Sequence, residues 1–170
     1  MGKAFTSQKG RAKIPHPEGS YVSKPTVVLV HGAFAESSDW NTVIAKLEAK
    51  GYSVVAVANP LRGVKYDAAY LASVLSSIKG PVILVGHSYG GNVITVAAAG
   101  KSNVKALVYV SGLAPDAGET ASALVGKFPG STLGPTLSSV VLPDGSKDLY
   151  ILQDKYHAQF SPTCPTVRPS

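Results

Sequence analysis

The sequence has almost no cysteine and no long apolar run. Its single cysteine, Cys164, permits no disulfide bond within the chain and lies far from any CxxC pattern, which excludes a disulfide scaffold and a paired-thiol redox site. No apolar stretch approaches the roughly 18 residues typical of a membrane span. The N-terminal residues lack the apolar core of a secretory signal. We therefore expect a cytoplasmic protein with no membrane partner.

Positive charge is concentrated in one short segment of the chain. The formal net charge of the 170 residues is +6, and residues 1–24 contribute +4 of it through five basic residues and the single acidic Glu18. A basic tail on a nearly neutral body is typical of a solvated segment. No nucleic-acid-binding motif accompanies it. We expect no nucleic-acid partner.

Four short apolar runs rich in β-branched residues predict strands, at residues 26–30, 52–58, 81–85 and 104–110. The first run is of the kind seen in strands buried on both faces. Segments with helical character separate them: one beginning near Ser38 and Asp39, which serve as candidate N-caps, then 67–78 and 92–99. Strands joined by helical crossovers form parallel sheets. The sequence therefore predicts an α/β fold, with a mostly parallel sheet and helices on both of its faces.

The pattern changes after residue 114. Residues 115–135 show no clean periodicity, whereas residues 137–142 and 147–152 flank the turn sequence Pro-Asp-Gly-Ser, which predicts a β-hairpin. Such an insertion after a strand commonly caps an active site. We divide the chain into a basic tail (1–24), an α/β core (25–114), a cap-like insertion with a hairpin (115–160) and a Pro-rich tail (161–170).

The most specific motif is Gly86-His87-Ser88-Tyr89-Gly90, which matches G-x-S-x-G and has a predicted strand before it and a helix after it. In this context the serine is a candidate nucleophile on a sharp, strained turn. Side chains at the two glycines would collide with the neighbouring backbone. Ser88 is therefore the predicted catalytic nucleophile.

Catalysis by such a nucleophile also requires donors for the oxyanion of a tetrahedral intermediate. We assign them to the backbone N–H of Tyr89 and, from the loop after the first strand, the N–H of Ala33. Phe34 and His87 are the predicted substrate-pocket residues. We interpret His31 and His87 as structural rather than catalytic. Trp40 is predicted to lie in the core.

The segments TVVLVHGAF…DW, VVAVANPLRG, PVILVGHSYGG and VKALVYVSGLAPDAGE together resemble the α/β-hydrolase superfamily. They are most similar to its small bacterial esterase-like members, akin to plant methyl-ester esterases and hydroxynitrile lyases. The resemblance covers roughly residues 25–160. It implies the α/β-hydrolase fold, a Ser-His-acid triad, acyl-ester substrates and no cofactor; we also predict no metal site.

The usual positions of the acid and the base are absent, because members of this superfamily continue past the cap and this chain ends at Ser170. We expect a C-terminally truncated member. The order in this fold is serine, acid, histidine, and of the four histidines only His157 follows Ser88 in that direction. Asp116 follows the fourth strand, where some members carry their acid. His157 is thus the candidate base and Asp116 the candidate acid; alternatively, His157 is a surface residue and Asp116 a turn residue.

These observations predict a serine carboxylesterase that cleaves small, short-chain acyl esters through an acyl-Ser88 intermediate. One alternative is a catalytically impaired binding or scaffold protein on the same fold. Another is a lactonase or lyase, since a fold does not determine its reaction. Without later strands the sheet keeps an open apolar edge, and such edges pair with other chains. We therefore expect a homo-oligomer formed through that edge, in which another chain is the alternative source of the missing part of the sheet or of the triad.

Overall fold

A four-stranded parallel sheet forms the centre of the protein, as the sequence predicts. The computed structural model describes residues 24–127, 129–160 and 162, so the two predicted tails lie almost entirely outside the described residues. The spatial order is β2-β1-β3-β4, and all three neighbouring pairs are parallel. The strands are β1 (Thr26–Val30), β2 (Val54–Val57), β3 (Val82–His87) and β4 (Val104–Val110).

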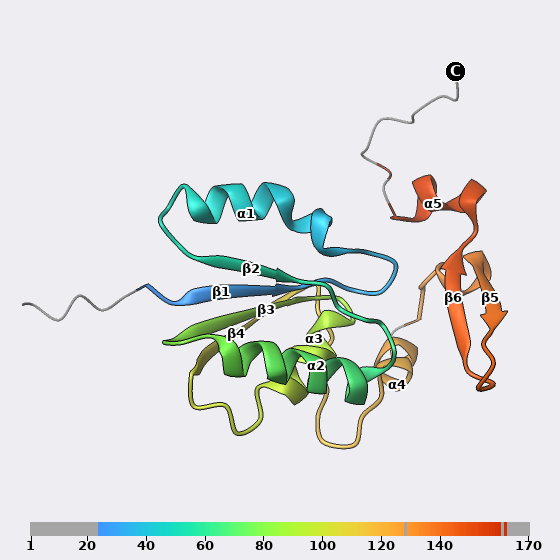
Figure 1. Cartoon of the computed structure of the whole chain (residues 1–170). Coiled ribbons are helices and arrows are strands. Elements are labelled where there is room, and N and C mark those ends of the chain that lie inside the picture. The colour runs from blue at the N-terminus through green and yellow to red at the C-terminus, as the bar shows by residue number, and fades with distance from the viewer. Residues whose placement is uncertain (1–23, 128, 161, 163–170) are drawn as a thin grey trace, which may run out of the picture.

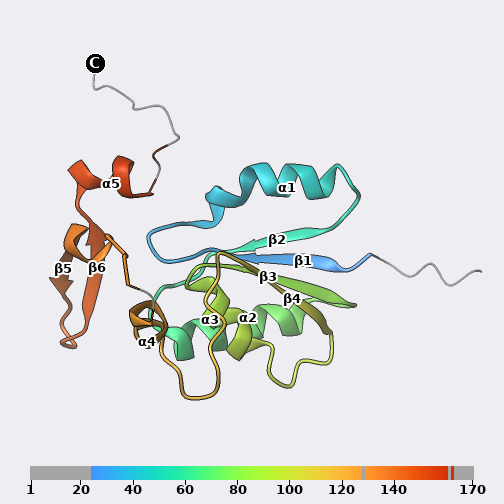
Figure 2. The same ribbon diagram turned by 180° about the vertical axis from the view of Figure 1, so that it is seen from behind.

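Helices cover both faces of this sheet. One face carries α1 (Asn41–Glu48), and the other carries α2 (Val64–Ser77) and α3 (Gly90–Ala97) (Figure 1). The opposite view shows the same three layers (Figure 2). A short 3-10 helix, η1 (Ser37–Trp40), leads into α1. Among the described helices, none combines the length and the apolar character that crossing a membrane requires.

Alternation along β1 divides the core into two clusters. Val28 and Val30 pack with buried residues of α2 and α3, whereas Val27 and Leu29 pack with Trp40 beneath α1. Successive side chains of a strand point to opposite faces of the sheet, so a strand buried on both faces is apolar throughout. Trp40 is only 8% exposed, which confirms its prediction as a core residue.

Two helices begin earlier than the sequence pattern indicates. Helix α2 starts at Val64 rather than Asp67, because Gly63 adopts a φ of +108° and its carbonyl accepts a hydrogen bond from the Asp67 N–H at 2.9 Å. Helix α3 starts at Gly90 rather than Asn92. Glycine has low intrinsic helix propensity, and here close packing of the backbone, described below, outweighs it.

The predicted hairpin is present beside the carboxyl ends of the parallel strands (Figures 1 and 2). Strands β5 (Leu137–Val141) and β6 (Lys147–Ile151) pair antiparallel. In the turn, the N–H and Oγ of Ser146 both donate to Asp144 Oδ1, at 2.9 and 2.6 Å. Gly145 supplies the positive φ of +82° that such turns require.

Three further helical elements surround the hairpin: α4 (Ala121–Gly126), a 3-10 turn η2 (Gly134–Thr136) and α5 (Gln153–Phe160). Helix α4 lies in the segment where no periodicity is visible. It is capped by Thr120, whose Oγ1 accepts a hydrogen bond from the Ala123 N–H at 3.1 Å. A threonine followed by an Ala-rich stretch was the available sequence signal for this helix.

Candidate active site

Ser88 occupies the sharp turn between β3 and α3. Its backbone φ is +51°, a left-handed conformation that costs a non-glycine residue roughly 1–2 kcal/mol. The backbone around it is held by three hydrogen bonds. The Ser88 N–H donates to the Val110 carbonyl at 3.3 Å, and the Ser88 carbonyl accepts from the N–H groups of Gly91 and Leu113 at 2.9 and 3.1 Å. Neighbouring backbone thus maintains the strained turn.

The glycines around Ser88 allow backbone segments to approach closely. A Cβ added to Gly86 would lie 2.6 Å from the Gly90 carbonyl oxygen. One added to Gly90 would lie 2.5 Å from the Val30 carbonyl oxygen, and one added to Gly91 would lie 2.4 Å from that of Leu113. These obstacles are backbone atoms, so a side chain cannot be accommodated by a rotamer change. The turn requires glycine at all three positions.

Backbone strain gathers at the carboxyl end of the sheet. Within the described residues, four non-glycine residues have a positive φ, and each follows a different parallel strand: Phe34 after β1, Leu61 after β2, Ser88 after β3 and Ser111 after β4. Strained backbone of this kind concentrates at functional sites. Ligands of open α/β sheets also bind outside the carboxyl ends of the strands. Both features indicate the same region as the site.

The loop after β1 lies directly against Ser88. A Cβ added to Gly32 would be 2.9 Å from the Ser88 Cβ. The loop is fixed by the buried His31, whose Nε2 accepts a hydrogen bond from the Asn59 N–H at 3.1 Å and whose Nδ1 lies 2.9 Å from the Gly32 carbonyl oxygen. Because Nε2 is an acceptor, Nδ1 carries the proton and donates. Both nitrogens are engaged with backbone, which agrees with a structural role for His31.

Tyr89 is anchored by a buried carboxylate that the sequence reasoning missed. The Tyr89 hydroxyl donates to Asp67 Oδ2 at 2.7 Å, and Asp67 Oδ1 accepts from the Arg62 N–H at 2.9 Å. Asp67 is fully buried. Burial first, and then the hydrogen bond to Asp67, raise the pKa of Tyr89 well above its ordinary value. The available signal was an aspartate among the apolar core positions of α2.

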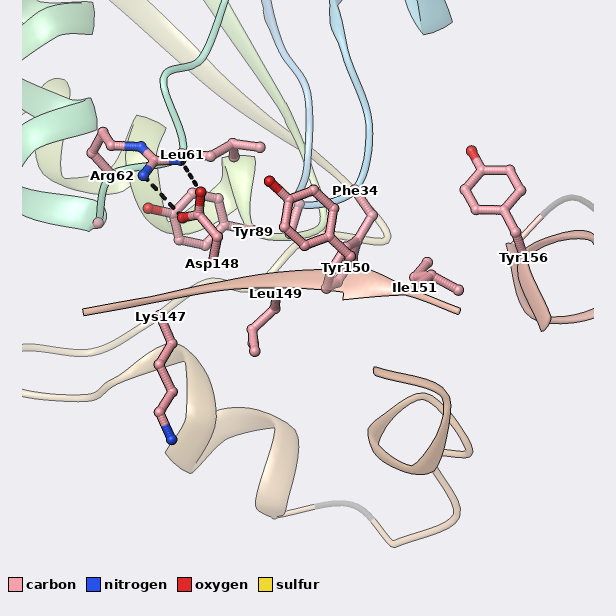
Figure 3. Close-up of a pocket in the computed structure, with 12 residues that line it drawn as sticks. Phe34, Leu61, Arg62, Tyr89, Lys147, Asp148, Leu149, Tyr150, Ile151 and Tyr156 are labelled. Atoms are coloured by element: carbon pink, nitrogen blue, oxygen red, sulfur yellow. Dashed lines mark hydrogen bonds and ion pairs between the residues drawn. The ribbon is translucent and has the colours of Figure 1, made fainter. Parts of the chain in front are cut away.

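A pocket of about 590 Å³ opens beside the elbow, between the sheet's carboxyl end and the hairpin (Figure 3). Its walls come from the loop after β1, the loop after β2, the elbow, strand β6 and helix α5. The lining residues are Ala33, Phe34, Leu61, Arg62, Gly63, Tyr89, Lys147, Asp148, Leu149, Tyr150, Ile151 and Tyr156. Three of the predicted site residues, Ala33, Phe34 and Tyr89, are therefore brought together around one pocket.

The predicted pocket residue His87 lies elsewhere. It is not among the lining residues of this pocket, and its ring packs edge-on against Trp40 with a centroid separation of 6.4 Å. This contact belongs to the side of the sheet covered by α1. The Ser88 side chain is also not part of the pocket wall, but the adjacent Tyr89 and the loop that contacts Ser88 are.

The candidate base and acid lie in different surface elements. His157 is a partly buried residue of α5, and Asp116 is an exposed residue in the turn before α4. The Asp116 N–H donates to Glu119 Oε2 at 2.8 Å. Within residues 24–127, 129–160 and 162, no hydrogen bond connects the side chains of Ser88, His157 and Asp116 to one another. The described residues also contain no cluster of three or more His, Cys, Asp or Glu that could hold a metal ion.

A parallel sheet covered by helices on both faces, with a strained serine between a strand and a helix, defines the α/β-hydrolase class. The chain belongs to the alpha/beta hydrolase family, whose family model matches residues 27–167. A curated relative, a probable hydrolase R7 from a Phoma species, is 32% identical over 114 residues, which cover 58% of this chain and 47% of that protein.

Solved structures show the same fold. A pyrethroid hydrolase from Sphingobium faniae aligns with a TM-score of 0.68 at 24% identity, over 86% of this chain and 65% of that one. Polyneuridine aldehyde esterase aligns with a TM-score of 0.64 at 25% identity, over 79% and 60% of the two chains. Tomato methylketone synthase I aligns with a TM-score of 0.62 at 27% identity, over 79% and 59%. The chain thus spans about half the length of the curated relative and about three fifths of these structures.

Proposed function

We propose that the protein is a serine hydrolase that cleaves carboxylic esters through an acyl intermediate on Ser88. The observation that carries this proposal is the Ser88 turn, in which neighbouring backbone maintains a φ of +51° and the adjacent glycines allow that backbone to approach closely. Maintaining such strain at a hydroxyl-bearing residue is characteristic of a nucleophile elbow. Membership of a hydrolase family and the esterases among the structural relatives support the same reaction class.

In this mechanism the Ser88 Oγ attacks the ester carbonyl carbon while a base takes its proton. The N–H groups of Ala33 and Tyr89 stabilise the oxyanion. The tetrahedral intermediate collapses, and the alcohol leaves with a proton returned by the base. Water then attacks the acyl-enzyme in the same way and releases the acid. We propose His157 as the base and Asp116 as the acid that orients it.

Hydrolysis of p-nitrophenyl esters by wild type and by Ser88→Ala tests the proposal. Loss of the nucleophile of a triad lowers the rate by up to about a million-fold, although roughly 10³–10⁴-fold over water can remain. We therefore expect turnover to fall to that residual level. A matched control is Ser73→Ala, since Ser73 is an exposed serine of α2 that bonds only to the Ala69 carbonyl.

The assignment of the base has its own test. His157→Ala should lower turnover as Ser88→Ala does, and unchanged turnover would assign the base to another residue. Unchanged turnover in Ser88→Ala would instead refute the serine mechanism. It would leave a binding protein or another reaction on the same fold as the better account.

A further inference from the structure

The pocket beside the elbow is large and mostly apolar. Its volume of about 590 Å³ falls within the range of about 300–1,000 Å³ found for sites that bury drug-sized ligands. Aromatic and aliphatic side chains dominate the wall, and two of them remain widely exposed: Tyr150 at 54% and Tyr156 at 41%. An acetyl or butyryl group would leave most of this apolar surface in water.

Three charged side chains also line the pocket, and two of them neutralise each other. The Arg62 guanidinium binds the Asp148 carboxylate with both of its terminal nitrogens, Nη1 to Oδ1 at 2.9 Å and Nη2 to Oδ2 at 3.2 Å. The third, Lys147, points to the opposite side of β6 from Asp148, as expected for adjacent residues of a strand (Figure 3). The pocket wall therefore presents no unpaired charge next to Tyr89.

The bridge joins two separate parts of the chain. Arg62 belongs to the loop after β2, and its backbone N–H donates to Asp67, the same carboxylate that accepts from the Tyr89 hydroxyl. Asp148 belongs to strand β6 of the hairpin. A two-pronged pair of this kind has a fixed geometry, so Asp148 positions the hairpin. It also occupies the guanidinium of Arg62, which among the described residues is the arginine that lines the pocket. Removing the carboxylate would free that cation within the pocket.

On the basis of the proposed esterase function, we propose that this pocket selects neutral esters with a bulky apolar or aromatic acyl group, and that Asp148 determines the selection by masking Arg62. The pocket begins at Ala33 and Tyr89, the proposed oxyanion donors, and Phe34 next to Ala33 also lines it, so we assign the acyl side of the bound carbonyl to this pocket. This substrate class differs from the short-chain esters that the sequence favours, and the ester series below distinguishes the two. Each further buried methylene should raise kcat/KM by up to about fourfold, equivalent to about 0.8 kcal/mol.

Binding of two unreactive ligands of matched size tests the selection without any hydrolysis. By calorimetry, wild type should bind the neutral 4-phenylbutanamide more tightly than the anionic 4-phenylbutanoate. In Asp148→Asn the freed guanidinium should shift the affinity ratio toward the carboxylate by at least about tenfold, which is equivalent to about 1.4 kcal/mol and lies at the lower end of what a hydrogen bond to a charged group contributes. Asp154→Asn is the control, because Asp154 is an exposed residue of α5 that pairs with Lys155 at 2.9 Å and does not line the pocket.

A second variant separates masking of charge from loosening of the hairpin. Arg62→Gln breaks the same bridge but leaves the negative Asp148, so it should shift the ratio further toward the amide. Shifts in opposite directions support the proposal. Shifts in the same direction, an unchanged ratio in Asp148→Asn, or equal binding of both ligands by wild type would overturn it.

Hydrolysis distinguishes this inference from the function on which it rests. We expect Ser88-dependent kcat/KM to rise along the acetyl, butyryl and octanoyl esters of p-nitrophenol. Ser88-dependent turnover that is flat or falls along this series would overturn the inference and leave the esterase function intact. Absence of Ser88-dependent turnover with every ester would overturn both.

Discussion

Substitution of Gly90 by alanine tests whether close backbone packing holds the elbow. The added Cβ would lie 2.5 Å from the Val30 carbonyl oxygen and 2.9 Å from that of His31, whereas ordinary contact begins near 3.4 Å. To relieve the clash, the start of α3 must move away from β1 by about 0.9 Å. Overpacking against a rigid neighbour costs up to about 3 kcal/mol, which corresponds to a fall in Tm of roughly 6–12 °C for a chain of this size.

The same displacement carries Ser88 away from the loop after β1. A misplacement of about 1 Å at a reacting group can lower the rate by about 100-fold, so esterase activity should fall by that factor. The matched control is Gly126→Ala, because a Cβ at Gly126 meets nothing within 4 Å. Thermal unfolding followed by circular dichroism measures the first effect. A Gly90→Ala protein with the Tm and activity of Gly126→Ala would refute the packing argument.

Three further predictions concern the buried carboxylate, the tyrosine it anchors and the edge of the sheet. Asp67→Asn replaces one of the two acceptor oxygens by an NH2 donor, which then faces either the Tyr89 hydroxyl or the Arg62 N–H. Urea unfolding should therefore show that the free energy of unfolding falls by about 1–3 kcal/mol, and an unchanged midpoint would contradict this. The raised pKa of Tyr89 means that its stabilising effect is complete below pH 10 and is lost at higher pH; absorbance at 295 nm should show one tyrosine that ionises late, and Tyr89→Phe should remove it. Strand β4 has no further strand beside it among the described residues, and Val108 at its edge is 42% exposed, so we propose that two copies pair there. Size-exclusion chromatography at micromolar concentration should show a dimer that Val108→Lys disrupts, and a monomeric wild type would contradict the pairing.

The parallel sheet was predictable because its two central strands, β1 and β3, are largely buried on both faces. Residues 26–30 and 82–85 are continuous apolar runs without an exposed side that could interrupt the pattern. The glycines of the elbow were equally predictable, since their role follows from the need for close backbone approach rather than from distant contacts. Helix boundaries were less so: Gly90 and Gly91 are helical only because β1 and the segment after β4 lie against them.

The contacts that build the pocket could not be read from local pattern. The bridge between Arg62 and Asp148 joins residues 86 positions apart, and both residue types are common on exposed surfaces. The same holds for the bond between Tyr89 and Asp67, although an acidic residue on the apolar side of α2 signals a buried partner. For the triad, order along the chain selected His157, and a position after the fourth strand selected Asp116. Neither criterion determines the distance between side chains in space.

The acyl-enzyme is the most direct test of the proposed mechanism. Wild type and Ser88→Ala are mixed with p-nitrophenyl octanoate, quenched in acid within the first turnover, digested and analysed by mass spectrometry. The account predicts one octanoyl group on the peptide that contains Ser88 in wild type, and none in the variant. Turnover that proceeds with the acyl group on another residue, or at an equal rate in Ser88→Ala, would contradict it.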